Sequence, residues 1–278
     1  GDLTARELAE AGKGLRARHW QLQAEAGIDV IPSNDFSFYD HMLDTSVLLG
    51  AVPPRFAGIS DPTALYFAMA RGTDAEPALE LTKWFATNYH YLVPEIGSDT
   101  VFTADPTKPL SEYAEARELG IATRPVLVGP ATFLLLAKGD DSFARPFARL
   151  DELVAVYAEL LGALARAGVA WVQLDEPAYA ADRTPEEIGA LRKAYGQLGG
   201  LTDRPALFVA TSFGELGDAL PALLATPVEA IGLDLVAGPG NLRALVDAGP
   251  MPGRTIVAGL VDGHNVWRTD LRAAATTG

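Results

Sequence analysis

The sequence predicts an α/β fold in which parallel strands alternate with helices, namely a (β/α)8 barrel. Three observations favour this fold. Apolar segments recur at intervals of roughly 30–40 residues, separated by segments with helical periodicity. These apolar segments are continuous rather than alternating, which is typical of parallel strands buried on both faces. The length of 278 residues suits one barrel, which commonly has about 250. An open, doubly wound sheet is the alternative.

The N-terminal part of the chain predicts helices around one short strand. A capping box of Thr4 and Glu7 begins a helix that runs to about Ala26. The apolar segment 28–31 predicts a strand that Pro32 ends. Two helices, over 40–50 and 62–70, and an extended excursion over the aromatic-rich segment 82–91 are expected next.

A regular helix–strand repeat begins near residue 110. The expected helices cover 110–119, 149–166, 185–198, 216–225 and 241–247. The expected strands cover 125–128, 169–174, 206–210, 230–236 and 255–261, and Val-Gly-Pro after the first of them is expected to be a turn. With segment 28–31 these are six parallel strands, whereas a closed barrel needs eight. The first and last strands are therefore expected to be missing, which would leave two strand edges unpaired.

Composition excludes several classes of function. A net charge of −14 disfavours nonspecific binding to nucleic acid or to anionic membranes. The chain has no cysteine, so it can form neither a disulfide nor a thiolate metal site. No apolar run reaches the roughly 18 residues of a membrane-spanning helix, and no signal-peptide core is present. We therefore expect a cytoplasmic location.

Two adjacent carboxylates, Asp175 and Glu176, directly follow the apolar strand expected over 169–174. Parallel α/β proteins bind ligands at the carboxyl ends of their strands. Neighbouring strand residues point to opposite faces, so the two are not expected to act as a matched acid/base pair. They belong either to a ligand site, or to a cap of a helix or loop together with an interior hydrogen bond. The other polar residues expected to converge at strand ends are Asn34, Asp35, Thr132, Thr211, Ser212, Asp234, Asp262, His264 and Asn265.

None of the four histidines lies in the spacing of a zinc hydrolase, and no phosphate-binding glycine loop follows a strand. His19 lies in an amphipathic helix and is expected to be structural. His90, between two tyrosines, is expected to pack, and His264 to bond within its loop. The role of His41 stays open.

Lys83 is a single cation within the aromatic segment 81–91. Charge and stacking together suit an anionic ligand that carries a flat ring. The alternative is an exposed lysine on an aromatic hairpin without a ligand.

Several stretches resemble the N-terminal domain of the cobalamin-independent methionine synthase family (5-methyltetrahydropteroyltriglutamate–homocysteine S-methyltransferases). They run in order through nearly the whole chain, and those at 82–95 and 258–271 are specific. The stretches are 15–20, 36–41, 43–50, 70–74, 82–95, 128–133, 171–178, 232–236 and 258–271.

The resemblance implies an enzyme of two similar (β/α)8 barrels. The C-terminal barrel carries zinc, the homocysteine site and the catalytic residues, while the N-terminal barrel supports it and helps to hold the folate polyglutamate tail. The family's folate-contacting lysine corresponds to Lys83, and its other N-terminal folate contacts would precede Gly1. Asp175 and Glu176 then form a structural copy of a catalytic-barrel motif. Residues 1–278 would be one incomplete N-terminal barrel with no catalytic residue and no metal site, inactive without the C-terminal barrel.

Two other functions stay open. One is a stand-alone small-molecule-binding barrel with a pocket near Asp175, Thr211 and Asp234. The other is a hydrolase in which Asp175 and either Asp234 or Asp262 lie about 5–10 Å apart across a pocket.

Overall fold

The computed structural model describes residues 3–139, 145–264 and 266–276. Its main sheet has six strands, all paired in parallel, in the order β1-β5-β7-β8-β9-β10. The strands are β1 (Ile31–Ser33), β5 (Thr123–Val128), β7 (Trp171–Asp175), β8 (Ala206–Ala210), β9 (Ala230–Asp234) and β10 (Thr255–Gly259). The expected α/β class with a parallel sheet is confirmed.

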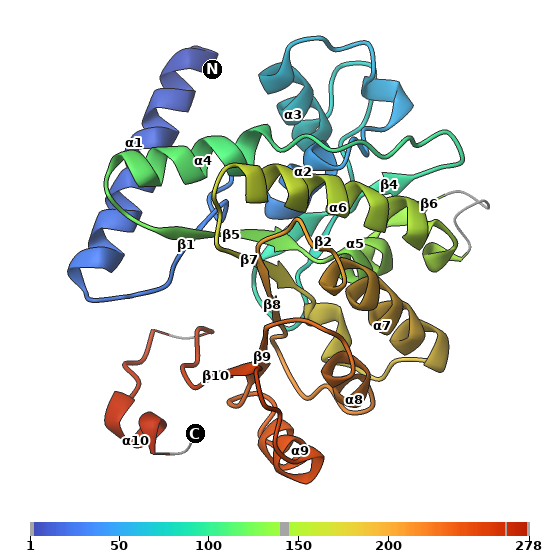
Figure 1. The fold of residues 1–278 in the computed structure, drawn as a ribbon. Coiled ribbons are helices and arrows are strands. Elements are labelled where there is room, and N and C mark those ends of the chain that lie inside the picture. The colour runs from blue at the N-terminus through green and yellow to red at the C-terminus, as the bar shows by residue number, and fades with distance from the viewer. Residues whose placement is uncertain (1–2, 140–144, 265, 277–278) are drawn as a thin grey trace.

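Helices cover one face of this sheet (Figure 1). Helices α4, α6, α7 and α8 lie in sequence along that face, and α1 packs against α4 and β1. The helices are α1 (Ala5–Glu25), α2 (His41–Leu48), α3 (Pro62–Arg71), α4 (Thr107–Glu118), α5 (Pro130–Leu136), α6 (Leu150–Arg166), α7 (Pro185–Gly199), α8 (Ala219–Leu224), α9 (Gly240–Ala248) and α10 (Leu271–Ala275). Short 3-10 turns cover Pro54–Phe56, Pro146–Arg149 and Pro177–Tyr179.

The main core lies between the sheet and these helices. Helix α6 buries Leu153, Tyr157, Leu160 and Leu164, which recur at helical spacing along one side of it. They pack in one cluster with the buried side chains of β7 and β8. Asp175 lies on the opposite face of β7, because successive strand side chains alternate. We call this second face, which also carries Arg124 and Phe208, the inner face.

Residues 34–122 form a long excursion between the neighbouring strands β1 and β5. It contains α2, α3, α4 and an antiparallel hairpin of β2 (Leu81–Lys83) and β3 (His90–Leu92). A further small parallel pair joins β4 (Glu95–Ile96) to β6 (Lys138–Gly139). The expected excursion over 82–91 is therefore this hairpin.

The first strand lies three residues later than the segment 28–31 predicts. Ile28 and Val30 are exposed, and Pro32 is inside β1 rather than after it. Proline lacks an N–H but is tolerated on an edge strand, and β1 pairs only with β5. After β5 the sequence predicts only a turn at Val-Gly-Pro, whereas Pro130 begins helix α5, in whose first turn its missing N–H costs nothing.

Among the residues that the structure describes, the two edge strands of the sheet, β1 and β10, each pair on one side only. On the inner face, Trp171 and Val257 stay 36% and 40% exposed, unlike the core side chains behind them. Within the described ranges, no helix has the length and apolarity to cross a bilayer.

Candidate ligand site at the carboxyl ends of the strands

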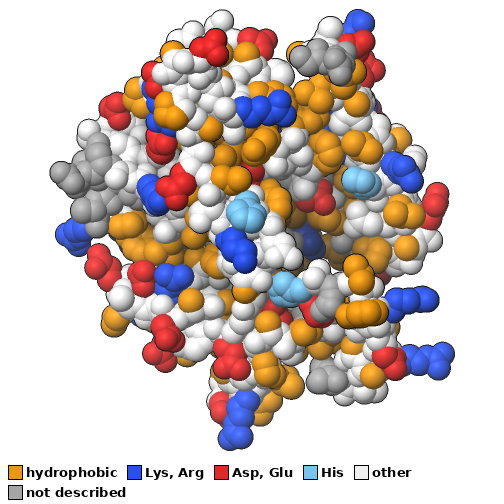
Figure 2. Space-filling view, turned by 180° about the vertical axis from the view of Figure 1, so that it is seen from behind, with side chains coloured by type: hydrophobic (Ala, Val, Ile, Leu, Met, Phe, Trp, Pro, Cys, Tyr) orange, Lys and Arg blue, Asp and Glu red, His pale blue; other side chains and the backbone are white. Residues whose placement is uncertain are grey.

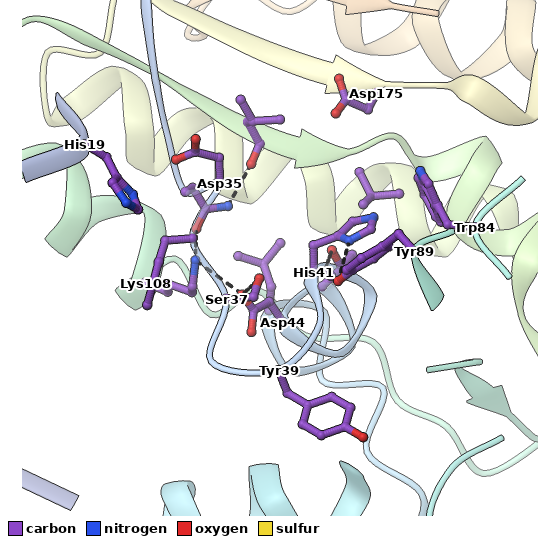
Figure 3. Close-up of a pocket in the computed structure, with 16 residues that line it drawn as sticks. His19, Asp35, Ser37, Tyr39, His41, Asp44, Trp84, Tyr89, Lys108 and Asp175 are labelled. Carbon is purple, nitrogen blue, oxygen red and sulfur yellow. Dashed lines mark hydrogen bonds and ion pairs between the residues drawn. The ribbon is translucent and has the colours of Figure 1, made fainter. Parts of the chain in front are cut away.

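A cavity of about 540 Å³ opens beyond the carboxyl ends of β1, β5 and β7. Asp175 lies on its far wall, opposite His41 of α2 and Lys108 of α4 (Figure 3). Trp84 and Tyr89 of the hairpin also line it. Figure 2 shows the hollow on the corresponding face of the molecule, with histidine and basic side chains near it.

Asp175 faces the cavity from the end of β7. The Nε2 of Gln173 donates to its Oδ1 at 2.6 Å. Burial raises the pKa of Asp175 to about 6, although the Gln173 hydrogen bond and the charge of Arg124 both act to lower it. The Arg124 guanidinium lies over the Phe208 ring at 5.0 Å. Asp175 therefore takes up a proton more readily than an exposed carboxylate.

Glu176 points the other way and is fully buried. It accepts hydrogen bonds from the backbone N–H groups of Ala131 (3.1 Å) and Thr132 (2.6 Å) and from the Tyr195 hydroxyl (2.7 Å). Burial raises its pKa to about 7, and these hydrogen bonds only partly offset the effect. A Cβ at Gly129 would lie 2.2 Å from the Glu176 carboxylate, so only glycine fits there. The burial and the hydrogen bonds of Glu176 are typical of a structural residue.

A polar network fixes the wall of the cavity beside β1. The Lys108 Nζ donates to Asn34 Oδ1 at 3.0 Å and pairs with Glu112 (3.1 Å) and Asp44 (3.4 Å). Asn34 adopts a φ of 60° and donates through Nδ2 to the Val126 carbonyl at 2.7 Å. The sequence points to Asn34 but not to Lys108 or Asp44. The i,i+4 spacing of Lys108 and Glu112 is the signal available for the lysine.

The hairpin is anchored to α2 by one buried carboxylate, Asp40. Its Oδ2 accepts from the N–H groups of Leu43 (2.9 Å) and Leu92 (3.0 Å), and its Oδ1 accepts from the Tyr89 hydroxyl (2.9 Å). The His41 ring packs edge-on against Trp84, with centroids 4.4 Å apart. These contacts hold the hairpin at the rim of the cavity.

Lys83 lies on the exposed side of β2. Among the described residues its side chain forms no hydrogen bond or ion pair. The structure thus places a solvent-facing cation next to Trp84, which lines the cavity.

Two phenylalanines with positive φ join the hairpin to the strand-end loops. Phe85 (φ 50°) stacks on Phe213 (φ 77°) at 5.6 Å, and Phe213 meets His264 at 5.7 Å. Bulky residues seldom adopt this conformation, and such strain concentrates at functional sites. The loop after β8 thereby contacts the segment that carries Lys83, and the loop after β10 contacts the loop after β8.

Three of the strand-end residues do converge on the cavity: Asn34, Asp35 and Asp175. The others are engaged elsewhere or lie away from it. Thr132 accepts from the Ala178 N–H, Thr211 donates to the Gly232 carbonyl, Ser212 is half-buried, Asp262 contacts His264, and Asn265 lies outside the described residues.

Asp234 accepts three backbone hydrogen bonds, from Phe213 (2.9 Å), Val236 (2.9 Å) and Ala237 (2.8 Å). It therefore holds the loop after β8 and the loop after β9, and β9 ends at Asp234 rather than at residue 236 as expected. Neither Thr211 nor Asp234 lines the cavity at Asp175. The pocket required by the small-molecule alternative and the acid pair required by the hydrolase alternative thus find no support in this geometry.

The histidines differ partly from expectation. His19 is exposed and borders the cavity, and His41 lines it between two aromatic rings. Burial lowers the pKa of His41 more than the nearby Asp40 and Asp44 raise it. The expected packing of His90 is wrong: its side chain is exposed, because the alternation of β3 turns Tyr91 inward instead.

No group of three or more histidine or acidic side chains in the described ranges is placed to hold a metal ion. Without cysteine, the chain also lacks thiolate ligands.

The chain is similar in sequence to one protein family and to several of its members. The family described as "Cobalamin-independent synthase, N-terminal domain" matches residues 1–277. The chain is 54% identical to a 5-methyltetrahydropteroyltriglutamate–homocysteine methyltransferase of Streptomyces coelicolor, covering 100% of this chain and 37% of the relative. Identity to the protein of the same name from Rhodococcus jostii is 55%, covering 99% and 36%.

The Mycobacterium tuberculosis protein of that name is 54% identical, with coverage of 100% and 36%. The chain thus spans little more than a third of these relatives. A solved structure, the B12-independent methionine synthase from Shewanella in complex with selenomethionine, aligns with a TM-score of 0.71 over 99% of this chain and 77% of that one. At 18% identity, this likeness shows the fold alone.

Proposed function

Since this chain belongs to the cobalamin-independent synthase family and matches its N-terminal domain, we propose that it helps to bind the folate tail of a methionine synthase. The relatives' name specifies a methyl donor that carries three glutamates. Such a tail is a polyanion, and a protein binds it with exposed cations. The observation that carries the proposal is Lys83, whose side chain has no partner among the described residues and lies on an anchored hairpin that borders the cavity.

The reaction proposed for the complete enzyme is methyl transfer from folate N5 to the sulfur of homocysteine. Zinc, held by the C-terminal barrel, would lower the thiol pKa there so that the thiolate attacks. The part described here supplies binding and support. We expect the chain by itself to form no methionine from homocysteine and methylfolate with added zinc; turnover above background would contradict this.

We also propose that the six strands are part of an eight-stranded barrel of one N-terminal domain. Support comes from their all-parallel pairing, the two one-sided edges and the exposed inner-face side chains Trp171 and Val257. Strands from outside residues 1–278 would close the barrel between β1 and β10. Persistent solvent exposure of the β10 edge in a longer protein would contradict it. A cytoplasmic location remains part of the proposal.

The decisive experiment is titration calorimetry of this chain with 5-methyltetrahydropteroyltriglutamate. We expect saturable binding that Lys83→Ala weakens at least about tenfold, or about 1.4 kcal/mol. Lys13→Ala is the matched control, because it removes an equal charge from the exposed side of α1, and its affinity should equal that of the unsubstituted chain.

Equal affinities of Lys83→Ala and Lys13→Ala would show that Lys83 does not bind the tail. Absence of binding by a demonstrably folded chain would leave it as a scaffold. Saturable binding of unrelated small molecules at the cavity, but not of the folate, would favour the stand-alone binding function instead.

A further inference from the structure

His90 lies directly opposite Lys83 in the hairpin. The antiparallel register pairs the two Cα positions, and both side chains are exposed. Directly opposed residues share one face of the ladder, with Cβ atoms about 5 Å apart. A ligand group that contacts the Lys83 ammonium is therefore within reach of the His90 ring.

One hydrogen bond determines which ring nitrogen of His90 can meet a ligand. Its Nδ1 lies 3.1 Å from the Asn88 carbonyl. A carbonyl only accepts, so Nδ1 carries the proton in this contact. The other nitrogen, Nε2, accepts when the ring is neutral and donates when the ring is protonated. A carboxylate also only accepts, so His90 can bind one only as the imidazolium.

The acidic groups that the structure describes around the hairpin do not form ion pairs with Lys83 or His90, because they are engaged by other residues. Glu80 precedes β2 and is engaged by Lys138. Asp40 is taken by Leu43, Leu92 and Tyr89.

The titratable groups on neighbouring elements are likewise engaged. His41 packs against Trp84 and Tyr89, and burial lowers its pKa. His264, reached through Phe213, contacts Asp262 within its own loop. Within the described residues, no ion pair involves Lys83 or His90, although the whole chain carries a net charge of −14. The pair is thus a local site for negative charge on an otherwise acidic protein.

The hairpin presents both side chains from a constrained backbone. The Trp84 N–H donates to the Tyr89 carbonyl at 2.8 Å, and the Thr87 hydroxyl donates to the Trp84 carbonyl at 2.6 Å. Phe85, at the tip, is held by its stack on Phe213. A preformed site of this kind loses little conformational entropy when a ligand binds.

We propose that His90 is a second binding residue for the polyglutamate tail, contacting a tail carboxylate together with Lys83 and taking up a proton as the tail binds. This inference rests on the proposed function of Lys83. It predicts that the affinity for the tail falls as the pH rises, because histidine loses its charge between pH 5 and 8.

The test is calorimetry of this chain with 5-methyltetrahydropteroyltriglutamate at pH 6 and pH 8, in two buffers of different ionisation enthalpy. We expect binding to be up to about fivefold tighter at pH 6, as for an exposed ion pair, with proton uptake seen as a buffer-dependent heat. His90→Gln should bind with the same affinity at pH 6 and pH 8, without proton uptake. His90→Lys should bind tightly at both pH values.

The outcomes separate the two proposals. If Lys83→Ala weakens binding but His90→Gln keeps the full pH dependence and proton uptake, the role of His90 is overturned and that of Lys83 stands. If the folded chain does not bind the tail, or Lys83→Ala binds it unchanged, the proposed function fails and the inference fails with it. Since His90 is exposed, its variants should retain the circular dichroism spectrum of the parent chain.

Discussion

At the scale of single residues, the buried Glu176 links the stability of the fold to pH. Its pKa rises from 4.5 to about 7 on folding, chiefly through burial. The folded chain thus holds the proton more tightly than the unfolded chain does. The tighter proton binding adds its full contribution to the free energy of unfolding below pH 4.5. This contribution is lost as the pH rises to about 7.

Replacement of the carboxylate by an amide should remove this dependence. From pH 4.5 to 8, the free energy of unfolding of the original chain should fall relative to that of Glu176→Gln, by up to about 3 kcal/mol. Urea unfolding of both proteins at several pH values measures the difference. Parallel stability curves would show that Glu176 does not titrate in this range.

Gly129 permits the close approach of Glu176 and should not tolerate a side chain. In Gly129→Ala the new Cβ would overlap the carboxylate, and we expect a loss of about 1–3 kcal/mol of stability. Gly14→Ala is the control, since Gly14 lies in α1 with open space around its Cβ position. That variant should be more stable by up to about 1 kcal/mol. Equal urea midpoints for the two variants would contradict this account.

At the scale of elements, the hairpin and α2 depend on the same carboxylate. Asp40→Ala leaves the buried N–H groups of Leu43 and Leu92 without an acceptor, so we expect a loss of about 1–3 kcal/mol and faster hydrogen exchange at both amides. Asp61→Ala removes the exposed cap of α3 alone. It should cost about 1 kcal/mol and leave exchange at Leu92 unchanged. Unchanged exchange at Leu92 in Asp40→Ala would show that Asp40 does not anchor the hairpin.

Local sequence signals predict most elements because they report local physics. The capping box at Thr4 and the continuous apolar strands place α1 and the parallel sheet correctly. The signals fail where tertiary context decides. Pro32 is accepted within β1 because that strand is an edge, and Pro130 begins a helix rather than a turn.

At the scale of the whole molecule, the site was only partly predictable. Asp175 and Asn34 follow strands, so topology alone brings them to one cavity. Lys108 and Tyr89 reach it from the long excursion, whose path no local pattern specifies. For His90, the neighbouring tyrosines suggested packing, whereas the pairing with Lys83 becomes visible only once the hairpin register is known.

The excursion also bears on the order in which the molecule folds. The β1–β5 pairing joins residues about 90 positions apart, Ile31 and Thr123, whereas Phe208 pairs with Ala230 only about 20 positions away. Distant contacts close more slowly, so we expect β7, β8 and β9 to form the folding nucleus and β1 to dock last. Pulse-labelled hydrogen exchange during refolding should protect Val209 before Ser33, and simultaneous protection would contradict this order. Destabilising substitutions in the nucleus would then slow folding, while those in α1 and β1 would mainly accelerate unfolding.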